Sequence, residues 1–174
     1  MTSVSAMTLP ELNNLPAAAR AEELRRCCGS AAWVAALNQQ FPFADAEMLY
    51  QTATNTWNDL SAADWREAFA HHPKIGDVGA LREKFASTST WAEGEQGAVR
   101  QASEETLRAL AAGNAAYEQR FGYIFIVCAT GKSAADMLAL LQARLPNPPE
   151  QEIRVAAAEQ DKITRIRLEK LLAA

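Results

Sequence analysis

The sequence predicts an all-α fold, a single compact domain (residues 1–174) of about eight to ten helices. Alanine, leucine, glutamate, glutamine and arginine dominate the composition, and β-branched residues are sparse before residue 124. Apolar residues recur at spacings of three and four, which indicates amphipathic helices. Serine, threonine, glycine and proline stand where such segments would begin and end. With 174 residues, the chain is long enough to bury a core without disulfides.

Composition and charge exclude several classes of function. The net charge is -4 and its acidic and basic residues are mixed, so the basic stripe of a nucleic-acid-binding protein is missing. The sequence shows neither an apolar run long enough for a membrane span nor a signal peptide. An odd number of cysteines, Cys27, Cys28 and Cys128, indicates reduced thiols. We therefore expect a cytoplasmic protein without nucleic-acid or membrane partners.

The N-terminal third of the chain predicts three short helices. Thr8 begins a helical turn that ends near Asn13. Proline at the start and glycine past the end delimit a helix at Pro16–Cys28, closed by Gly29. Ser30 caps the next helix, which Pro42 stops.

Two amphipathic helices should follow. The first covers Ala44 to about Asp59. The second begins at Ser61 with Asp64 three residues later, a capping pattern. It cannot continue past His72, because Pro73 disfavours a helical conformation in the residue before it.

The middle of the chain predicts further helices at 79–85 and from Thr90 to about Ala112. Gly113 should then separate a last helix or turn that reaches Arg120. Near the start of the longer helix, Gly94 and Gly97 each cost about 1 kcal/mol relative to alanine. Either another group approaches the backbone closely there, or two helices pack tightly.

Phe121–Ala129 is the most apolar stretch, and by propensity it favours a buried strand. A single strand would have no partner, so we expect a buried extended or helical segment. Gly131–Leu145 should be helical up to Pro146, and Glu150–Leu172 should form a long final helix.

The two histidines of the chain, His71 and His72, are adjacent. Histidines most often lie on the protein surface or at the end of a helix without a catalytic role. Pro73 restricts the backbone beside His72, and Gly76 permits a tight turn of the chain. The side chain of His72 should therefore be held rigidly, as acid–base catalysis requires. His71 should lie in the last helical turn, where a cation suits the helix dipole.

Two arginines in the final helix should differ. Arg165 has acidic residues four positions away on either side, so we expect it on a solvated, salt-bridged face. Arg167 has Ile163 and Leu171 at the same spacing, so it lies within the apolar stripe. An inward arginine needs a partner or an anionic ligand, whereas one at the edge of the stripe extends its head to water.

Three other motifs have simpler explanations. Gly131–Ser133 looks like the end of a phosphate-binding loop, but Ile126 occupies the position of its first glycine, so Ser133 is read as a helix cap. No His/Cys spacing fits a metal site, so we expect none. Cys128 lies in an apolar run, where burial makes a thiol inert.

Four stretches together resemble a known family. They are His72-Pro73-Lys74-Ile75-Gly76, Glu95-Gln96, the run at 120–129 and Ile163-Thr164-Arg165-Ile166-Arg167-Leu168. Over nearly the whole chain, their order and spacing resemble those of the 2-oxo-4-hydroxy-4-carboxy-5-ureidoimidazoline (OHCU) decarboxylases. The resemblance implies an all-helical homodimer, without a cofactor, that converts the small molecule OHCU stereoselectively to (S)-allantoin in urate breakdown.

The resemblance also implies which residues form the site. His72 would manage a proton, Arg167 would hold anionic or carbonyl oxygens, and Glu95 would hold NH groups of the substrate, which makes these three the catalytic candidates. Ala92 stands where the family often has serine, so a hydroxyl contact is in question there. The substrate-binding candidates are Pro73, Ala92, Gln96, Phe125, Ile126, Val127, Cys128 and Ala129.

Two alternatives remain open from the sequence. A non-catalytic helical adaptor would leave His72, Glu95 and Arg167 scattered over the surface. A lyase or hydrolase acting on a related ureido compound would bring them together, and only a substrate assay separates it from OHCU decarboxylation.

Overall fold

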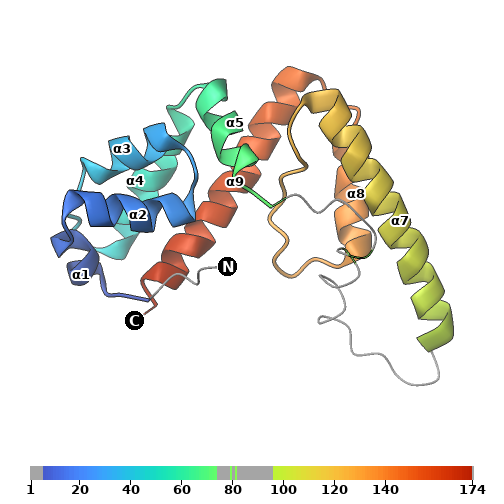
Figure 1. Cartoon of the computed structure of the whole chain (residues 1–174), viewed down its shortest axis with the longest axis horizontal. Coiled ribbons are helices and arrows are strands. Elements are labelled where there is room, and N and C mark those ends of the chain that lie inside the picture. The colour runs from blue at the N-terminus through green and yellow to red at the C-terminus, as the bar shows by residue number, and fades with distance from the viewer. Residues whose placement is uncertain (1–5, 74–78, 80, 82–95, 174) are drawn as a thin grey trace. The chain divides into compact units, whose positions relative to one another are not determined.

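The computed structural model describes residues 6–73, 79, 81 and 96–173; the side chains of residues 96–103 lie outside this description (Figure 1). Within these ranges every regular element is a helix, which confirms the all-α class. The chain divides into two compact units, Met1–His72 with Ala157–Ala174, and Pro73–Ala156. The expectation of one domain over residues 1–174 stays a prediction.

The first unit begins with five helices whose starts follow the capping residues read from the sequence. The side chains of Thr8, Ser30 and Ser61 each accept a hydrogen bond from a backbone N–H in the first turn, as expected. Asp45 caps α4 in the same way. The helices are α1 (Leu9–Asn14), α2 (Ala17–Cys27), α3 (Ala31–Asn38), α4 (Ala46–Asn58) and α5 (Ala62–Ala70).

The core of this unit is organised around α3, which packs against α2, α4 and α5. Trp33 on α3 is fully buried and donates its indole N–H to the Ala53 carbonyl at 3.1 Å. Trp57 on α4 is also buried and donates to the Ala157 carbonyl at 2.9 Å. Each buried indole therefore has a partner, and the second bond ties α4 to the C-terminal helix within the unit.

The second unit contains α7 (Gln96–Phe121) and α8 (Ala134–Arg144), which pack against each other. The expected break at Gly113 was wrong, because α7 continues through it. A Cβ atom at Gly113 would lie 2.5 Å from Cδ2 of Leu141 on α8. The glycine therefore permits close packing of two helices rather than ending one.

The apolar segment after α7 is neither strand nor helix from Ile124 to Ala129, so the helical alternative was wrong. Of these residues, only Ile126 and Cys128 are buried. The next helix begins at Ala134 rather than Gly131, because Gly131 adopts a positive φ of 73°. Ser133 forms a capping box with Asp136, which confirms its reading as a cap.

The last helix, α9 (Pro149–Leu171), begins in the second unit and continues into the first. No helix of the described ranges is both long and apolar enough to span a bilayer. The helix expected at 79–85 falls outside the described residues apart from positions 79 and 81. The expected helix start at Thr90 and the close approach at Gly94 also lie outside them.

Candidate active site

The two histidines follow the end of α5 and have different surroundings. His71 is the C-cap of α5 and is exposed. Its ring lies over Gly29, where an added Cβ would be 2.5 Å from the ring. His72 is half-buried, and its backbone N–H donates to the Phe69 carbonyl at 3.2 Å, which closes the helix end just before Pro73. His71 is therefore an exposed helix cap, whereas the imidazole of His72 is partly buried.

The partner of the buried imidazole lies on α9. Nε2 of His72 forms a short hydrogen bond with Oε1 of Gln160. The Gln160 side chain is 1% exposed, and its Nε2 donates to Oγ1 of Thr164 at 3.0 Å. Thr164 is also buried and lies close enough to Cys28 to oppose the rise in the pKa of that thiol. A chain of polar side chains thus runs from the imidazole into the core of the first unit.

Arg167 lies on the same face of α9, because residues 160, 164 and 167 are spaced by four and three. It is half-buried, and its guanidinium donates to the Cys27 carbonyl at 3.3 Å. This contact uses one of five N–H donors. Within the part of the chain that the structure describes, Arg167 forms no ion pair with a carboxylate. Its positive charge is therefore not paired with any carboxylate of the described residues.

Burial and charge decide the protonation states in this cluster. Burial lowers the pKa of His72, the bond to Gln160 opposes this shift, and the positive charge of Arg167 lowers the pKa further. Burial also raises the pKa of Cys27 to about 12 and that of Cys28 to about 11. Near pH 7 the site therefore holds a neutral imidazole, two protonated thiols and a guanidinium cation.

Arg165 behaves as expected for the solvated face. It pairs with Glu169 at 2.8 Å and with Glu47 at 3.4 Å, and 42% of its side chain is exposed. Asp161, which the spacing also offered as a partner, instead accepts a hydrogen bond from the Thr54 hydroxyl at 3.1 Å. Arg165 and Arg167 therefore face different surroundings although only one residue separates them.

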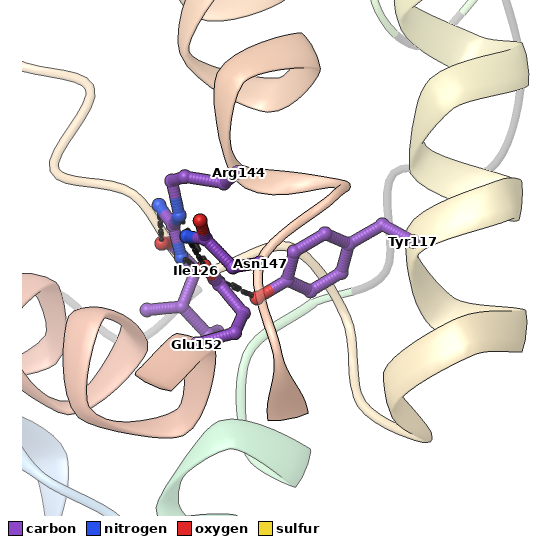
Figure 2. Close-up of polar contacts among 5 residues, drawn as sticks. All are labelled: Tyr117, Ile126, Arg144, Asn147 and Glu152. Atoms are coloured by element: carbon purple, nitrogen blue, oxygen red, sulfur yellow. Dashed lines mark hydrogen bonds and ion pairs between the residues drawn. The ribbon is translucent and has the colours of Figure 1, made fainter. Parts of the chain in front are cut away.

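In the second unit, a buried ionic cluster holds the segment that was expected to line the site (Figure 2). Arg144 is 7% exposed and donates to the Ile126 carbonyl at 2.7 Å. The same guanidinium forms an ion pair with the fully buried Glu152 at 2.6 Å. Glu152 also accepts bonds from the Tyr117 hydroxyl and from Asn147, so its carboxylate is well satisfied.

The C-terminal end of this segment is also fixed. Lys132 donates its ammonium group to the Cys128 carbonyl at 2.8 Å and its backbone N–H to the Ala129 carbonyl at 3.1 Å. The side chains of Ile126 and Cys128 are buried, whereas Val127 between them is only half-buried. This alternation is the pattern of an extended chain that directs neighbouring residues to opposite sides.

The structure brings together two of the three catalytic candidates, His72 and Arg167, within the first unit. Glu95 and Ala92 lie outside the described residues, and Gln96 is the first residue of α7, with its side chain outside the description. The other substrate-binding candidates, described in the second unit, are Pro73, Phe125, Ile126, Val127, Cys128 and Ala129. Among described residues, no group of three or more His, Cys, Asp or Glu is arranged to hold a metal ion.

Sequence reasoning missed Gln160, Thr164 and the thiol pair. A usable signal existed for the first two, because Gln160 and Thr164 precede Arg167 at helical spacing on one face. Nothing in the local sequence indicates that Cys27 and Cys28 lie under that face, since α2 and α9 are far apart in the chain.

Comparison with known proteins gives a consistent result. The family model of OHCU decarboxylase matches residues 13–169. A uric acid degradation bifunctional protein of Arabidopsis thaliana is 38% identical over 153 residues, covering 86% of this chain and 46% of that protein. The chain thus spans about half the length of that relative. The OHCU decarboxylase of Amia calva is 29% identical over 139 residues, covering 75% of this chain and 74% of that enzyme.

Solved structures show the same likeness. A crystal structure of an OHCU decarboxylase in the presence of (S)-allantoin superposes with a TM-score of 0.70 and 33% identity, over 88% of this chain and 99% of that one. A crystal structure of (S)-allantoin synthase superposes with a TM-score of 0.66 over 93% of this chain and 53% of that one. At 22% identity, the second likeness supports the fold alone.

Proposed function

Since the chain belongs to the OHCU decarboxylase family, a family of decarboxylating lyases with relatives in uric acid degradation, we propose that it converts OHCU to (S)-allantoin. The observation that carries this proposal is the match of the family model over residues 13–169. The 33% identity to an OHCU decarboxylase crystallised with (S)-allantoin supports the same reaction.

The reaction sets clear demands on the site. The C–C bond to the carboxylate breaks, and its electron pair is delocalised into the neighbouring C=N and carbonyl groups of the ring. Carbon dioxide leaves, and a proton is added to a ring carbon on one face. Donors must meet the charge that develops, and one group must handle the proton stereoselectively.

We assign the proton to His72. Its lowered pKa keeps the imidazole neutral near pH 7, so the ring can take up a proton and return it. Partial burial and the bond to Gln160 restrict the orientation of the ring. A ring that is fixed in this way is suited to protonation on a single face.

Arg167 would hold the negative charge of the substrate. It is half-buried and lies close enough to His72 to influence its pKa. A planar guanidinium can bind two oxygens at once, either of the carboxylate or of the ring carbonyl. It would thus set the substrate beside the imidazole and stabilise the charge that forms as carbon dioxide leaves.

The remaining candidates would bind the ring and the ureido group. We propose that Glu95 and Gln96 accept and donate hydrogen bonds to these NH and carbonyl groups. Ala92 cannot supply a hydroxyl contact, so the site would rely on its neighbours. Pro73 would form part of the wall next to the imidazole.

The extended segment Phe125–Ala129 would present backbone groups to the substrate. The carbonyls of Ile126 and Cys128 are bound by Arg144 and Lys132. In an extended chain, the backbone groups of successive residues point to opposite sides, so the N–H and C=O of Val127 would face away from these two bonds. These are the groups that we propose for substrate binding.

We further propose that the protein works without a metal or organic cofactor, as a homodimer in the cytoplasm. Reduced, buried thiols at all three cysteines are compatible with that compartment. Sedimentation of the full chain tests the dimer, and dialysis against a chelator should leave the activity unchanged.

The direct test feeds freshly generated OHCU to the protein and follows the optical rotation of the allantoin. OHCU decays spontaneously to racemic allantoin, so the enantiomer matters more than the amount. We expect faster decay of OHCU with accumulation of the (S) form. Racemic product at the uncatalysed rate would refute the proposed function.

A further inference from the structure

Gln160 is the residue whose side chain contacts a ring nitrogen of His72. Its carboxamide is buried between the imidazole and the Thr164 hydroxyl. Oε1 of Gln160 faces His72, and Nε2 of the same amide donates to Thr164 at 3.0 Å. A carboxamide oxygen can only accept a hydrogen bond, so Nε2 of the imidazole must be the donor.

A neutral imidazole has one N–H and one bare nitrogen. If Nε2–H donates to Gln160, the lone pair of Nδ1 is free. We propose that Gln160 is a positioning residue that holds His72 in the Nε2–H tautomer, so that Nδ1 is the nitrogen that exchanges a proton with the substrate. This inference rests on the proposed role of His72 and adds which of its atoms acts and which residue selects it.

Thr164 supports this assignment from the other side. Its side chain lies beside the Cys28 thiol, which stays protonated because burial raises its pKa to about 11. Its oxygen accepts the Gln160 N–H. The amide is therefore held between Thr164 and His72, at a place where only 1% of Gln160 is exposed and water cannot substitute for a lost partner.

The charged groups around the imidazole agree with a neutral ring. Arg167 from α9 and His71 from the end of α5 both lower the pKa of His72, in addition to burial. Gln160 raises it but is itself uncharged. The ring therefore remains neutral near pH 7, and its tautomer, rather than its charge, is what Gln160 controls.

The first test reads the tautomer without any substrate. The chain has two histidines, so His71→Asn leaves a single imidazole in the protein. Nitrogen-15 NMR of this protein above the pKa of His72 should show a proton on Nε2 and a bare Nδ1. A proton on Nδ1 instead would overturn the proposal, whatever the protein's activity.

The second test measures activity in the same background. Gln160→Leu keeps the volume but removes the acceptor, so the imidazole can change tautomer and also turn away from its productive orientation. We expect the loss of positioning to lower kcat on the order of 100-fold, with KM little changed. Gln160→Glu retains an acceptor oxygen and should keep the Nε2–H tautomer, while its charge raises the pKa of His72. Unchanged kcat in Gln160→Leu would overturn the positioning role.

Thr164 gives a second pair of variants in case the leucine variant fails to fold. Thr164→Val removes the contact that orients Gln160 and should lower kcat, whereas Thr164→Ser keeps the hydroxyl and should restore it. Equal kcat for the two would contradict the inference. If the parent protein itself does not accelerate OHCU decay, the proposed function fails, and the NMR spectrum still decides the tautomer.

Discussion

Arg167 lies close enough to His72 for its positive charge to oppose protonation of the imidazole. Burial of the ring is the larger cause of the lowered pKa of His72, and Arg167 acts in the same direction. The hydrogen bond to the amide oxygen of Gln160 acts against both. The same pair thus places a neutral base beside a cation, the combination that a decarboxylase of an anionic substrate requires.

The two arginines of α9 provide a matched comparison. Arg167→Ala removes the proposed anion-binding group and should reduce kcat/KM about 100-fold or more, since charge-assisted hydrogen bonds contribute roughly 1.5–3 kcal/mol each. Arg165→Ala removes exposed ion pairs and should change stability by about 0–1 kcal/mol, with little effect on activity. Steady-state kinetics and urea unfolding measure both; the reverse order of severity would refute the assignment of the two faces.

The lowered pKa of His72 predicts the acidic limb of the pH profile. Activity that needs a neutral imidazole is lost as the pH falls through the pKa of His72, which lies below the usual histidine value of about 6.5. In a pH profile of kcat/KM, the midpoint of the acidic limb should therefore lie below pH 6.5. A midpoint at or above 6.5 would contradict the role of the buried imidazole.

Removal of the nearby charge should move this limb. In Arg167→Gln, NMR titration of His72 should give a higher pKa than in the parent, whereas Arg167→Lys keeps the charge and should leave it close to the parent value. An unchanged titration in Arg167→Gln would show that the two side chains do not interact in solution.

The buried ion pair of the second unit should be essential for stability. Arg144→Met leaves the carboxylate of Glu152 buried without its cation, which should cost about 3–5 kcal/mol in the free energy of unfolding. Replacing both residues with methionine should cost less than the single change. Arg120→Ala, which removes an exposed bond to the Asn147 carbonyl, is the control and should cost under about 1 kcal/mol. A mild effect of Arg144→Met in urea unfolding would contradict the role of the cluster.

The thiols under α9 should be inert in the native protein. Their pKa values of about 12 for Cys27 and about 11 for Cys28 keep both protonated at pH 8, and both are fully buried. Alkylation with iodoacetamide, read by mass spectrometry, should modify them only after unfolding. Rapid native modification together with loss of activity would instead indicate an accessible thiolate in the site.

Much of the fold follows from local chemistry in the sequence. The helix starts at Thr8, Ser30, Ser61 and Ser133 were predictable, because a capping side chain acts within its own first turn. The break at Gly113 was not, because the reason for that glycine is Leu141 on another helix. A glycine that ends a helix and one that admits a neighbour look the same in a single sequence.

In the candidate site, too, some residues could be predicted from the sequence and others could not. His72 and Arg167 were identified from a proline-fixed helix end and from an arginine within an apolar stripe, and the structure brings them together. The contacts of Arg144 with Glu152 and with the Ile126 carbonyl depend on tertiary packing, so the spacing of residues along the sequence does not predict them. Gln160 lay within reach of the helical-spacing argument, but its partner His72 is 88 residues away along the chain.

The most direct measurement of the central claim compares His72→Ala with His71→Asn on freshly generated OHCU, by following the enantiomer of the allantoin formed. Loss of the general acid–base group should lower the rate about 10²–10⁴-fold and leave only racemic product from spontaneous decay, with the helical circular dichroism intact. His71→Asn should still give (S)-allantoin at close to the parent rate. Stereoselective formation of (S)-allantoin by His72→Ala at the parent rate would contradict the account.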